Sequence, residues 1–265
     1  SIVNKLRSRE KELALANKQL AEQDRLKSQY VVTVSHDIQS PLSTIQNCLK
    51  VVLDGLTGKI PEKAQEMVSR AEQRVANLLN FVKDLLNLSR IKASYELDKK
   101  DFNYKELIKK TIEQLKTLAK PKNISIELQL QQNTSIMHAN QDAIVQLLTN
   151  LIINAIRYTP NNGKTGIQFK EHSTKKGCFH TMVWDEGIGI SEDDKTKIFD
   201  EFYRAKTAQE IEKDGTGLGL SIVKEIIKTH NGEIWVESEP EKSSKFIFTI
   251  SNNYKCSDCS ENKTF

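Results

Sequence analysis

Apolar residues recur every three or four positions along the first third of the chain, the spacing of one face of an α-helix. One such stripe contains Val31, Val34, Ile38, Leu42, Ile45, Leu49, Val52 and Leu56. After a segment rich in helix breakers at 54–61, a second stripe contains Val68, Ala71, Val75, Leu78, Val82 and Leu85. The two stripes predict a helical hairpin. One copy cannot bury both seams, so we expect two hairpins to close into a four-helix bundle, which makes the protein a homodimer.

The first 29 residues also predict helix, because they are mostly Lys, Glu, Gln, Ala and Leu and contain neither Gly nor Pro. Leu6, Leu13 and Leu20 repeat every seven residues, as in a coiled coil, although polar residues interrupt the seam. A solvated helix and a dimeric signalling helix both fit this pattern, and the repeat favours the second. Because the first residue is Ser and not Met, we expect a fragment of a longer protein.

After a polar connection at about residues 94–100 the period changes, and short alternating stretches mix with helical ones. Helices are predicted at 104–118, 142–157 and 218–230, and strands at 124–130, 165–170, 179–184, 233–237 and 245–250. This order predicts an α+β layer with helices on one face of a mixed sheet. We expect four regions: a coiled-coil helix at 1–29, the helical hairpin at 30–93, the α+β layer at 97–252 and a disordered polar tail at 253–265.

Composition narrows the classes of function. The 39 basic and 35 acidic residues give a formal net charge of only +4, which argues against nucleic-acid binding through a basic face. No apolar run is long enough to cross a bilayer, so we expect no membrane contact. The four cysteines are too few for a disulfide scaffold and favour a reducing compartment, and the Cys256-x-x-Cys259 pair in the tail is weak evidence for a metal or redox site.

Glycines gather in one part of the chain: five of the eleven lie between Gly187 and Gly219. Residues 185–190 (DEGIGI) follow a predicted strand, where glycine lets the backbone approach a flat ring and the carboxylate can accept from an exocyclic amine. Residues 215–220 (GTGLGL) open a predicted helix, whose free N–H groups attract phosphate. Neither segment is a Walker loop or a dinucleotide fingerprint. Together the two segments predict a nucleotide site.

Two further features carry candidate chemistry. Asn150 and Asn154 share one helix face, and amide oxygens are hard ligands of the kind that suits Mg²⁺. His36 lies two residues from Val34 and from Ile38, so it is expected opposite the apolar stripe, beside the carboxylate of Asp37. Pro41 weakens the helix nearby, which makes an exposed imidazole there a plausible nucleophile; an incidental surface histidine is the alternative.

At this point the chain resembles the sensor histidine kinases of two-component signalling over about residues 30 to 250. The matching motifs are the H box (35–42), the N box (150–160), the first glycine box (185–190), the F box (199–204) and the second glycine box (215–220). The resemblance implies a dimerisation and histidine-phosphotransfer hairpin at 30–93. It implies an ATP-binding domain of the gyrase and chaperone type at 97–252.

By this resemblance His36 is the phosphoacceptor for the γ-phosphate of ATP and Asp37 is its base, in the place where Glu is commoner in the family. Ser40 stands where Thr or Asn is usual, at a position tied to dephosphorylation of a partner regulator. The implied metal ligands to Mg²⁺ are Asn154 and Asn150. The other implied nucleotide-binding residues are Arg157, Tyr158, Asp185, Gly187, Gly189, Ile190, Arg204, Gly215, Thr216, Gly217, Leu218 and Gly219, with a lid at about 203–216.

The implied partners are a second copy of the chain, the receiver domain of a response regulator and an upstream sensor domain, with no nucleic acid. The implied location of this fragment is the cytoplasm, whether or not the full-length protein is anchored to a membrane. A dimeric scaffold that binds nucleotide without transferring phosphate is the alternative function, and a plain ATPase of the chaperone or topoisomerase type is a second. The presence of His36 upstream of the glycine boxes argues against both.

Overall fold

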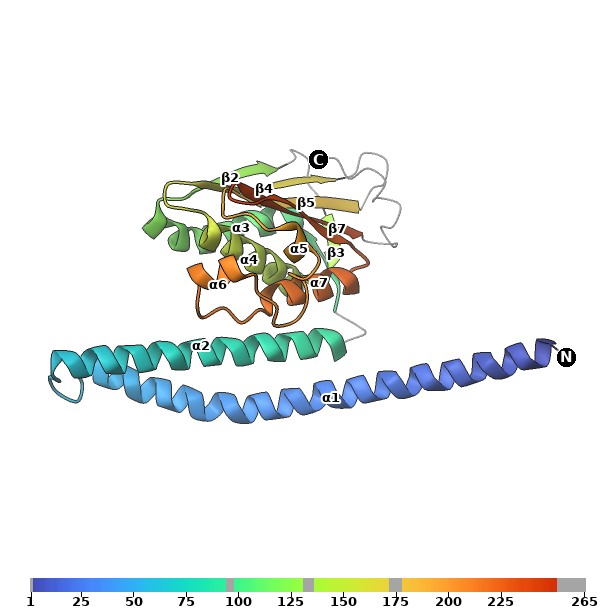
Figure 1. Ribbon diagram of the computed structural model, residues 1–265, viewed down its shortest axis with the longest axis horizontal. Coiled ribbons are helices and arrows are strands. Elements are labelled where there is room, and N and C mark those ends of the chain that lie inside the picture. The colour runs from blue at the N-terminus through green and yellow to red at the C-terminus, as the bar shows by residue number, and fades with distance from the viewer. Residues whose placement is uncertain (1, 94–97, 131–135, 172–177, 252–265) are drawn as a thin grey trace. The chain divides into compact units, whose positions relative to one another are not determined.

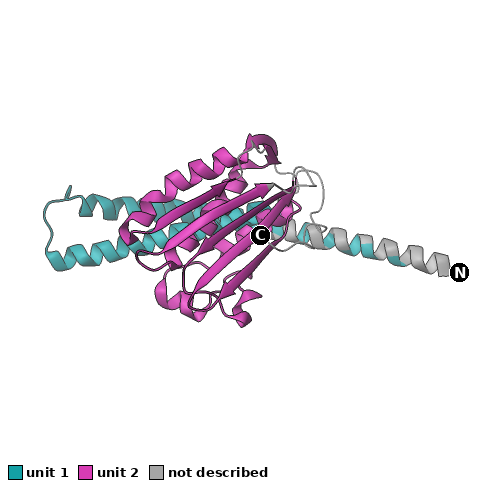
Figure 2. Cartoon of the chain, turned by 90° about the horizontal axis from the view of Figure 1, so that it is seen from above, with its two compact units in different colours: residues 1–94 teal, residues 95–265 magenta. Residues whose placement is uncertain are grey.

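The computed structural model describes residues 2–93, 98–130, 136–171 and 178–251. The chain divides into two compact units, residues 1–94 and residues 95–265, and each is described by itself (Figure 2). The expected tail at 253–265, with Cys256 and Cys259, lies outside the described residues.

The first unit is a hairpin of two long helices, α1 (Ile2–Leu53) and α2 (Glu62–Ala93), which lie side by side (Figure 1). The turn between them contains Gly55 at φ +76° and Gly58 at φ +95°, in the left-handed region that glycine enters without steric cost. Helix α1 continues through Pro41, which has no N–H to bond the carbonyl of the preceding turn. The predicted helical hairpin is confirmed.

Each helix of the hairpin carries more apolar surface than its partner helix covers. On α2, Leu79 and Val82 are buried within the hairpin, whereas Leu78 of the predicted apolar stripe is exposed in a single copy. On α1, Ile38 and Ile45 lie exposed one heptad apart. A single hairpin therefore leaves an apolar seam in water, a pattern that a second hairpin can relieve.

The second unit is built on a five-stranded sheet in the order β2-β4-β5-β7-β6. Its strands are β2 (Ser125–Leu130), β4 (Lys164–Glu171), β5 (Cys178–Asp185), β6 (Ile234–Glu239) and β7 (Ser243–Ser251). Strands β2 and β4 pair in parallel and the remaining neighbours pair antiparallel, so the sheet is mixed as predicted. Two short strands, β1 (Lys100–Asn103) and β3 (Ile136–Ala139), form a separate antiparallel pair that the apolar pattern did not predict.

Three helices cover one face of this sheet (Figure 1): α3 (Tyr104–Ala119), α4 (Gln141–Tyr158) and α7 (Gly219–Thr229). The side chain of Asn140 caps α4 by accepting from the backbone N–H of Ala143. Two short helices, α5 (Glu192–Lys195) and α6 (Lys206–Ile211), and a 3₁₀ turn (Lys120–Lys122) complete the unit. Helix α6 lies inside the segment expected to be a lid, where no regular structure was predicted.

The core lies between this helical layer and the sheet. Tyr104 at the start of α3 contacts the rings of Phe169 and Phe179 edge-on, at 5.0 and 6.1 Å between centroids. Its hydroxyl shares a 2.9 Å hydrogen bond with Thr181, so the buried phenol keeps a polar partner. Burial raises the pKa of Tyr104. These contacts fix α3 against β4 and β5, the strands that lead into the candidate site.

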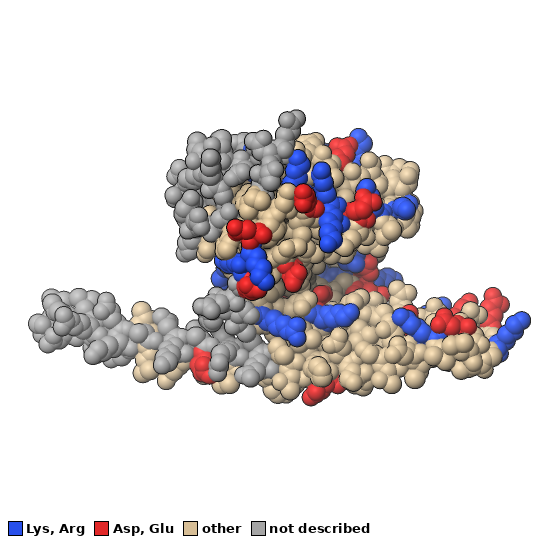
Figure 3. Space-filling view, turned by 180° about the vertical axis from the view of Figure 1, so that it is seen from behind, with Lys and Arg blue, Asp and Glu red and all other residues tan. Residues whose placement is uncertain are grey.

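Charges of both signs are interspersed on the face of the molecule drawn in Figure 3, as the small net charge leads one to expect. No helix in the described ranges is both long enough and apolar enough to span a bilayer. Of the cysteines that the structure describes, Cys48 on α1 is an exposed free thiol.

Candidate functional site

The candidate phosphoacceptor lies in the open on α1. The side chain of His36 is 81% exposed and that of Asp37 is 75% exposed, with 3.7 Å between Nδ1 and Oδ1. This distance is longer than a hydrogen bond, so the carboxylate lies beside the imidazole without binding it. Ser40 is exposed one turn further on and precedes Pro41. The prediction that His36 faces outward agrees with this geometry.

In the second unit, helix α4 meets the beginning of α7. Asn150 donates from Nδ2 to the carbonyl oxygen of Gly219 at 3.3 Å. The amide is thereby oriented, and its Oδ1 is left as an acceptor. Asn154 is half-buried one turn later on α4, and Tyr158 follows after another turn. The polar face predicted for α4 therefore lies against the second glycine segment, 69 residues further along the chain.

Asp185 at the end of β5 is buried, although it is a carboxylate. It accepts hydrogen bonds from the backbone N–H groups of Gly187, at 3.0 Å, and of Ser244. These bonds favour the ionised form, but burial outweighs them and raises the pKa of Asp185 to about 7. A Cβ at Gly187 would lie 2.8 Å from the carbonyl oxygen of Tyr158. The first glycine segment is thus packed against the C-terminal end of α4.

The rest of the first glycine segment is held against the β6–β7 hairpin. Gly189 has φ +66°, and a Cβ there would collide with the backbone of Glu239 and Pro240. Ile190 donates its N–H to Oγ of Ser238 at 2.8 Å. A side chain at Gly189 would be strained by both its backbone conformation and the collision, which explains why this position is glycine.

The second glycine segment closes a loop. Gly217, at φ +71°, accepts at its carbonyl a hydrogen bond from the N–H of Phe202 at 3.1 Å. Oγ1 of Thr216 accepts from the N–H of Leu218, which is buried. The two ends of the predicted lid, 203–216, are therefore joined at Phe202 and Gly217.

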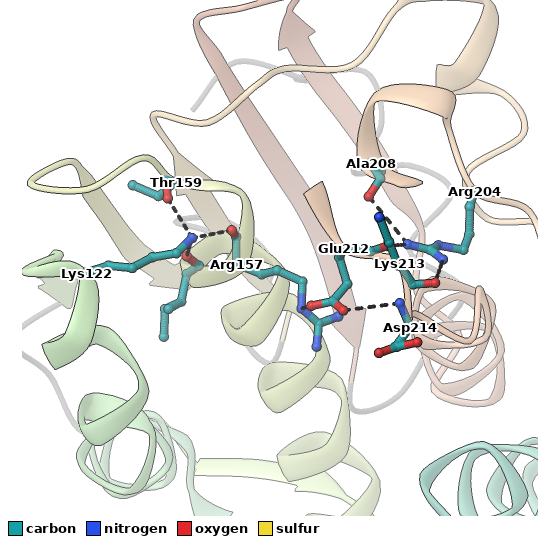
Figure 4. A network of polar contacts seen from close by, with 9 residues as sticks. Lys122, Arg157, Thr159, Arg204, Ala208, Glu212, Lys213 and Asp214 are labelled. Atoms are coloured by element: carbon teal, nitrogen blue, oxygen red, sulfur yellow. Dashed lines mark hydrogen bonds and ion pairs between the residues drawn. The ribbon is translucent and has the colours of Figure 1, made fainter. Parts of the chain in front are cut away.

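Both arginines predicted to bind phosphate, Arg204 in this loop and Arg157 on α4, contact the lid (Figure 4). Arg204 donates to the carbonyl oxygens of Lys213 at 3.2 Å, of Ala208 at 3.4 Å and of Glu212. Its guanidinium also lies beside Gly215, where an added Cβ would approach to 3.0 Å. Arg157 on α4 forms an ion pair with Glu212, 3.2 Å from Nε to Oε2.

Lys122 is a member of the site that the sequence did not indicate. Its Nζ donates to the carbonyl oxygens of Ile156 (3.2 Å), Arg157 (2.5 Å) and Thr159 (3.0 Å), at the end of α4 (Figure 4). Burial first, and then the charge of Arg157, lower the pKa of Lys122. The lysine satisfies carbonyls that a helix end leaves unpaired, and so holds the turn that carries Arg157 and Tyr158.

Two family models match the chain. Residues 26–94 match the His Kinase A (phospho-acceptor) domain, and residues 139–253 match the histidine kinase-, DNA gyrase B-, and HSP90-like ATPase. The first match contains His36 and the second contains the predicted nucleotide-binding residues on α4 and in both glycine segments.

Curated relatives carry names of the same kind. The sensor histidine kinase WalK of Bacillus subtilis (strain 168) is 28% identical over 86% of this chain and 37% of its own length. An uncharacterized sensor-like histidine kinase, ycf26, of Porphyra purpurea is 30% identical over 88% of this chain and 37% of its own. The chain thus spans little more than a third of these relatives.

Solved structures resemble the chain as well. The catalytic domain of histidine kinase ThkA is 33% identical, with a TM-score of 0.52, over 59% of this chain and 97% of that one. Full-length ShkA, in complex with AMPPNP, has a TM-score of 0.70 over 85% of this chain and 46% of that one. At 23% identity the second likeness supports the fold alone.

Proposed function

The chain belongs to the sensor histidine kinases of two-component signalling, and from that premise we propose that it transfers the γ-phosphoryl group of ATP to His36. The observation that carries the proposal is the hydrogen bond of Asn150 to Gly219, since it joins the polar face of α4 to the second glycine segment. Side-chain amides, glycine backbone and a helix N-terminus that lie close together suit a nucleoside triphosphate with its metal ion.

The reacting group is the imidazole of His36. Its Nδ1 is the nitrogen nearer to Asp37, so Nε2 is the nitrogen that attacks the γ-phosphorus. As the new N–P bond forms, the bond from phosphorus to the β–γ bridging oxygen breaks and ADP leaves. Asp37 takes up the Nδ1 proton or stabilises the positive charge on the ring, for which the 3.7 Å separation must shorten.

Asp185 is the acceptor for the exocyclic amine of adenine, because it is a buried carboxylate at the end of a strand. Gly187 and Gly189 let the segment after Asp185 pack closely against Tyr158 and Glu239, and Ile190 bonds Ser238 of the β6–β7 hairpin; in this proposal the base lies beside this segment. An ionised carboxylate accepts a hydrogen bond more strongly than the acid does. Because the pKa of Asp185 is raised to about 7, we expect adenine binding to strengthen as the pH rises through neutrality.

The phosphates lie, in this proposal, between α4 and the second glycine segment. Arg157 and Arg204 neutralise their charge, Tyr158 lines them with its uncharged phenol, and residues 215–219 donate N–H groups from the start of α7. Among the described residues no cluster of three His, Cys, Asp or Glu side chains could hold a metal ion. Mg²⁺ would bind to the amide oxygens of Asn150 and Asn154, where it would neutralise phosphate charge.

Transfer of the phosphoryl group from His36 to an aspartate of a response regulator completes the proposed activity. Ser40 keeps a hydroxyl that would hold a water for hydrolysis of the regulator's aspartyl phosphate, which releases inorganic phosphate and frees the aspartate. The exposed Ile38 and Ile45 support a homodimer through the hairpin. The chain spans 37% of the length of each of these relatives, which supports a further domain in the whole protein; we propose that it is an upstream sensor domain. A cytoplasmic location for this part of the protein follows from its proposed role as a kinase core.

Incubation with γ-labelled ATP tests the proposal. We expect label that is stable in base and labile in acid, and that is absent from His36→Gln. Asp37→Asn should slow the labelling without weakening ATP binding. Label that persists in His36→Gln would reject His36 as the acceptor. ATP binding without label in the unaltered chain would favour the nucleotide-binding scaffold instead.

A further inference from the structure

Glu212 is a residue of the lid (203–216), and its carboxylate faces Arg157 on α4. One oxygen, Oε2, lies 3.2 Å from Nε of Arg157, and the other, Oε1, accepts from the N–H of Asp214 at 3.3 Å. Its backbone carbonyl accepts from Arg204. A single lid residue thus contacts both arginines of the proposed phosphate site (Figure 4).

We propose that Glu212 occupies the place at Arg157 that a nucleotide phosphate takes, so that phosphate must displace it for ATP to bind. This inference rests on the proposed nucleotide site. Guanidinium groups bind carboxylate and phosphate oxygens with the same planar geometry, so the carboxylate is a chemical stand-in for phosphate. The two anions repel each other and cannot share one guanidinium edge.

The ion pair is weak enough to be exchanged. Its side chains are 37% and 31% exposed, so water screens the attraction and an incoming anion can reach it. Arg204 binds the backbone carbonyl of Glu212, so rotation of the Glu212 side chain alone leaves that bond in place. A displacement that also moves the backbone of Glu212 changes the contact of Arg204 with the lid.

The anchor of the lid confines this motion. Phe202 and Gly217 are joined by their 3.1 Å backbone hydrogen bond, and Gly217 leaves no room for a side chain against Phe202. The loop between them can therefore move while its ends stay in place. Exchange of carboxylate for phosphate at Arg157 couples the arrival of nucleotide to a change in the lid.

The test compares Glu212→Gln with Glu210→Gln in the full chain. Glu210 is an exposed residue of α6, so the control removes the same charge from the same lid away from Arg157. For ADP we expect Glu212→Gln to lower the Kd by about two- to five-fold relative to Glu210→Gln, the range of a partly exposed ion pair. For adenosine, which has no phosphate, both variants should match the unaltered chain.

A second measurement needs no nucleotide. Amide hydrogen exchange at residues 205–214 should be faster in Glu212→Gln than in Glu210→Gln, because the lid has lost its contact with α4. Equal exchange in the two variants, or equal Kd values for ADP, would overturn the inference. An unaltered chain that binds neither ADP nor adenosine would instead reject the proposed nucleotide site, so the two failures are distinguishable.

Discussion

Replacement of Asp185 by Asn should separate the stability of the second unit from its binding of nucleotide. In the folded protein burial raises the pKa of this carboxyl from 3.8 to about 7. Between pH 3.8 and about pH 7, the Asp185 carboxyl therefore keeps its proton in the folded protein but has lost it in the unfolded chain. Stability from this group is greatest below pH 4, falls as the pH rises to about 7 and is constant above that.

The magnitude follows from the shift. About three pH units at about 1.4 kcal/mol each give about 4 kcal/mol of lost stability at pH 8. The amide introduced by Asp185→Asn cannot ionise, so the variant escapes this loss. The amide also replaces one acceptor oxygen with an NH₂ group that faces the N–H of Gly187 or Ser244, which costs about 1–3 kcal/mol. We expect the variant to be more stable than the unaltered chain at pH 8 and less stable at pH 4.

Urea unfolding followed by tryptophan fluorescence measures this difference. Both tryptophans, Trp184 and Trp235, belong to the second unit, so their signal reports its unfolding and not that of the helical hairpin. Asp200→Asn, which removes an exposed carboxylate of the same unit, controls for net charge.

The decisive quantity is the change with pH of the difference in unfolding free energy between Asp185→Asn and the unaltered chain. A difference that stays the same between pH 4 and pH 8 would refute the reasoning, because it would mean that burial does not raise the pKa of Asp185. We also expect Asp185→Asn to weaken binding of ATP, since adenine would lose its charged acceptor. A variant that is more stable at pH 8 yet binds ATP less well would show that the carboxylate is kept for function.

Three further predictions concern other contacts. His230 is buried, donates from Nδ1 to the carbonyl of Ile226 and accepts at Nε2 from the N–H of Asn140, and burial lowers its pKa. The second unit should therefore lose stability as the pH falls below 6.5, and His230→Gln should lessen that dependence in the same urea assay. Lys122→Met leaves the carbonyls at the end of α4 unpaired, so we expect a loss of about 1–3 kcal/mol in urea unfolding and a higher Kd for ATP by calorimetry. Ile45→Asp places a charge in the exposed apolar seam of α1 and should convert the proposed dimer to a monomer, which sedimentation equilibrium measures. The α-helical circular dichroism signal, recorded at high protein concentration, should be retained, which would show that the helices still form.

The helices and long strands could be predicted from the sequence because their signals are local. Helix α4 was expected at 142–157 and spans Gln141–Tyr158, and the strand expected at 179–184 spans Cys178–Asp185. In each case the apolar residues repeat with the period of the element, since one face must be buried. The glycine segments were also recognisable, because a backbone that must approach another chain segment closely admits no side chain.

The short pair of β1 and β3 could not be predicted in this way. Each strand has four residues, too few for a period, and the partners are 39 residues apart at Lys100 and Ala139. On α2 the sequence did not distinguish Leu79, which is buried within the hairpin, from Leu78, which is exposed in a single copy. Neighbouring leucines fit either face, and which of them contacts α1 depends on where α1 lies.

By itself the sequence determined the kind of chemistry available: an imidazole beside a carboxylate, two amides on one helix face and glycines in two segments. Only the tertiary structure decided which of these groups meet and in what state of charge. Lys122 and Glu212 are unremarkable in a chain rich in charged residues, and they matter because folding brings them to Arg157. The pKa of Asp185 likewise depends on the strands around it, because removal of water from a carboxylate is a property of the packed core and not of the residues beside it in the chain.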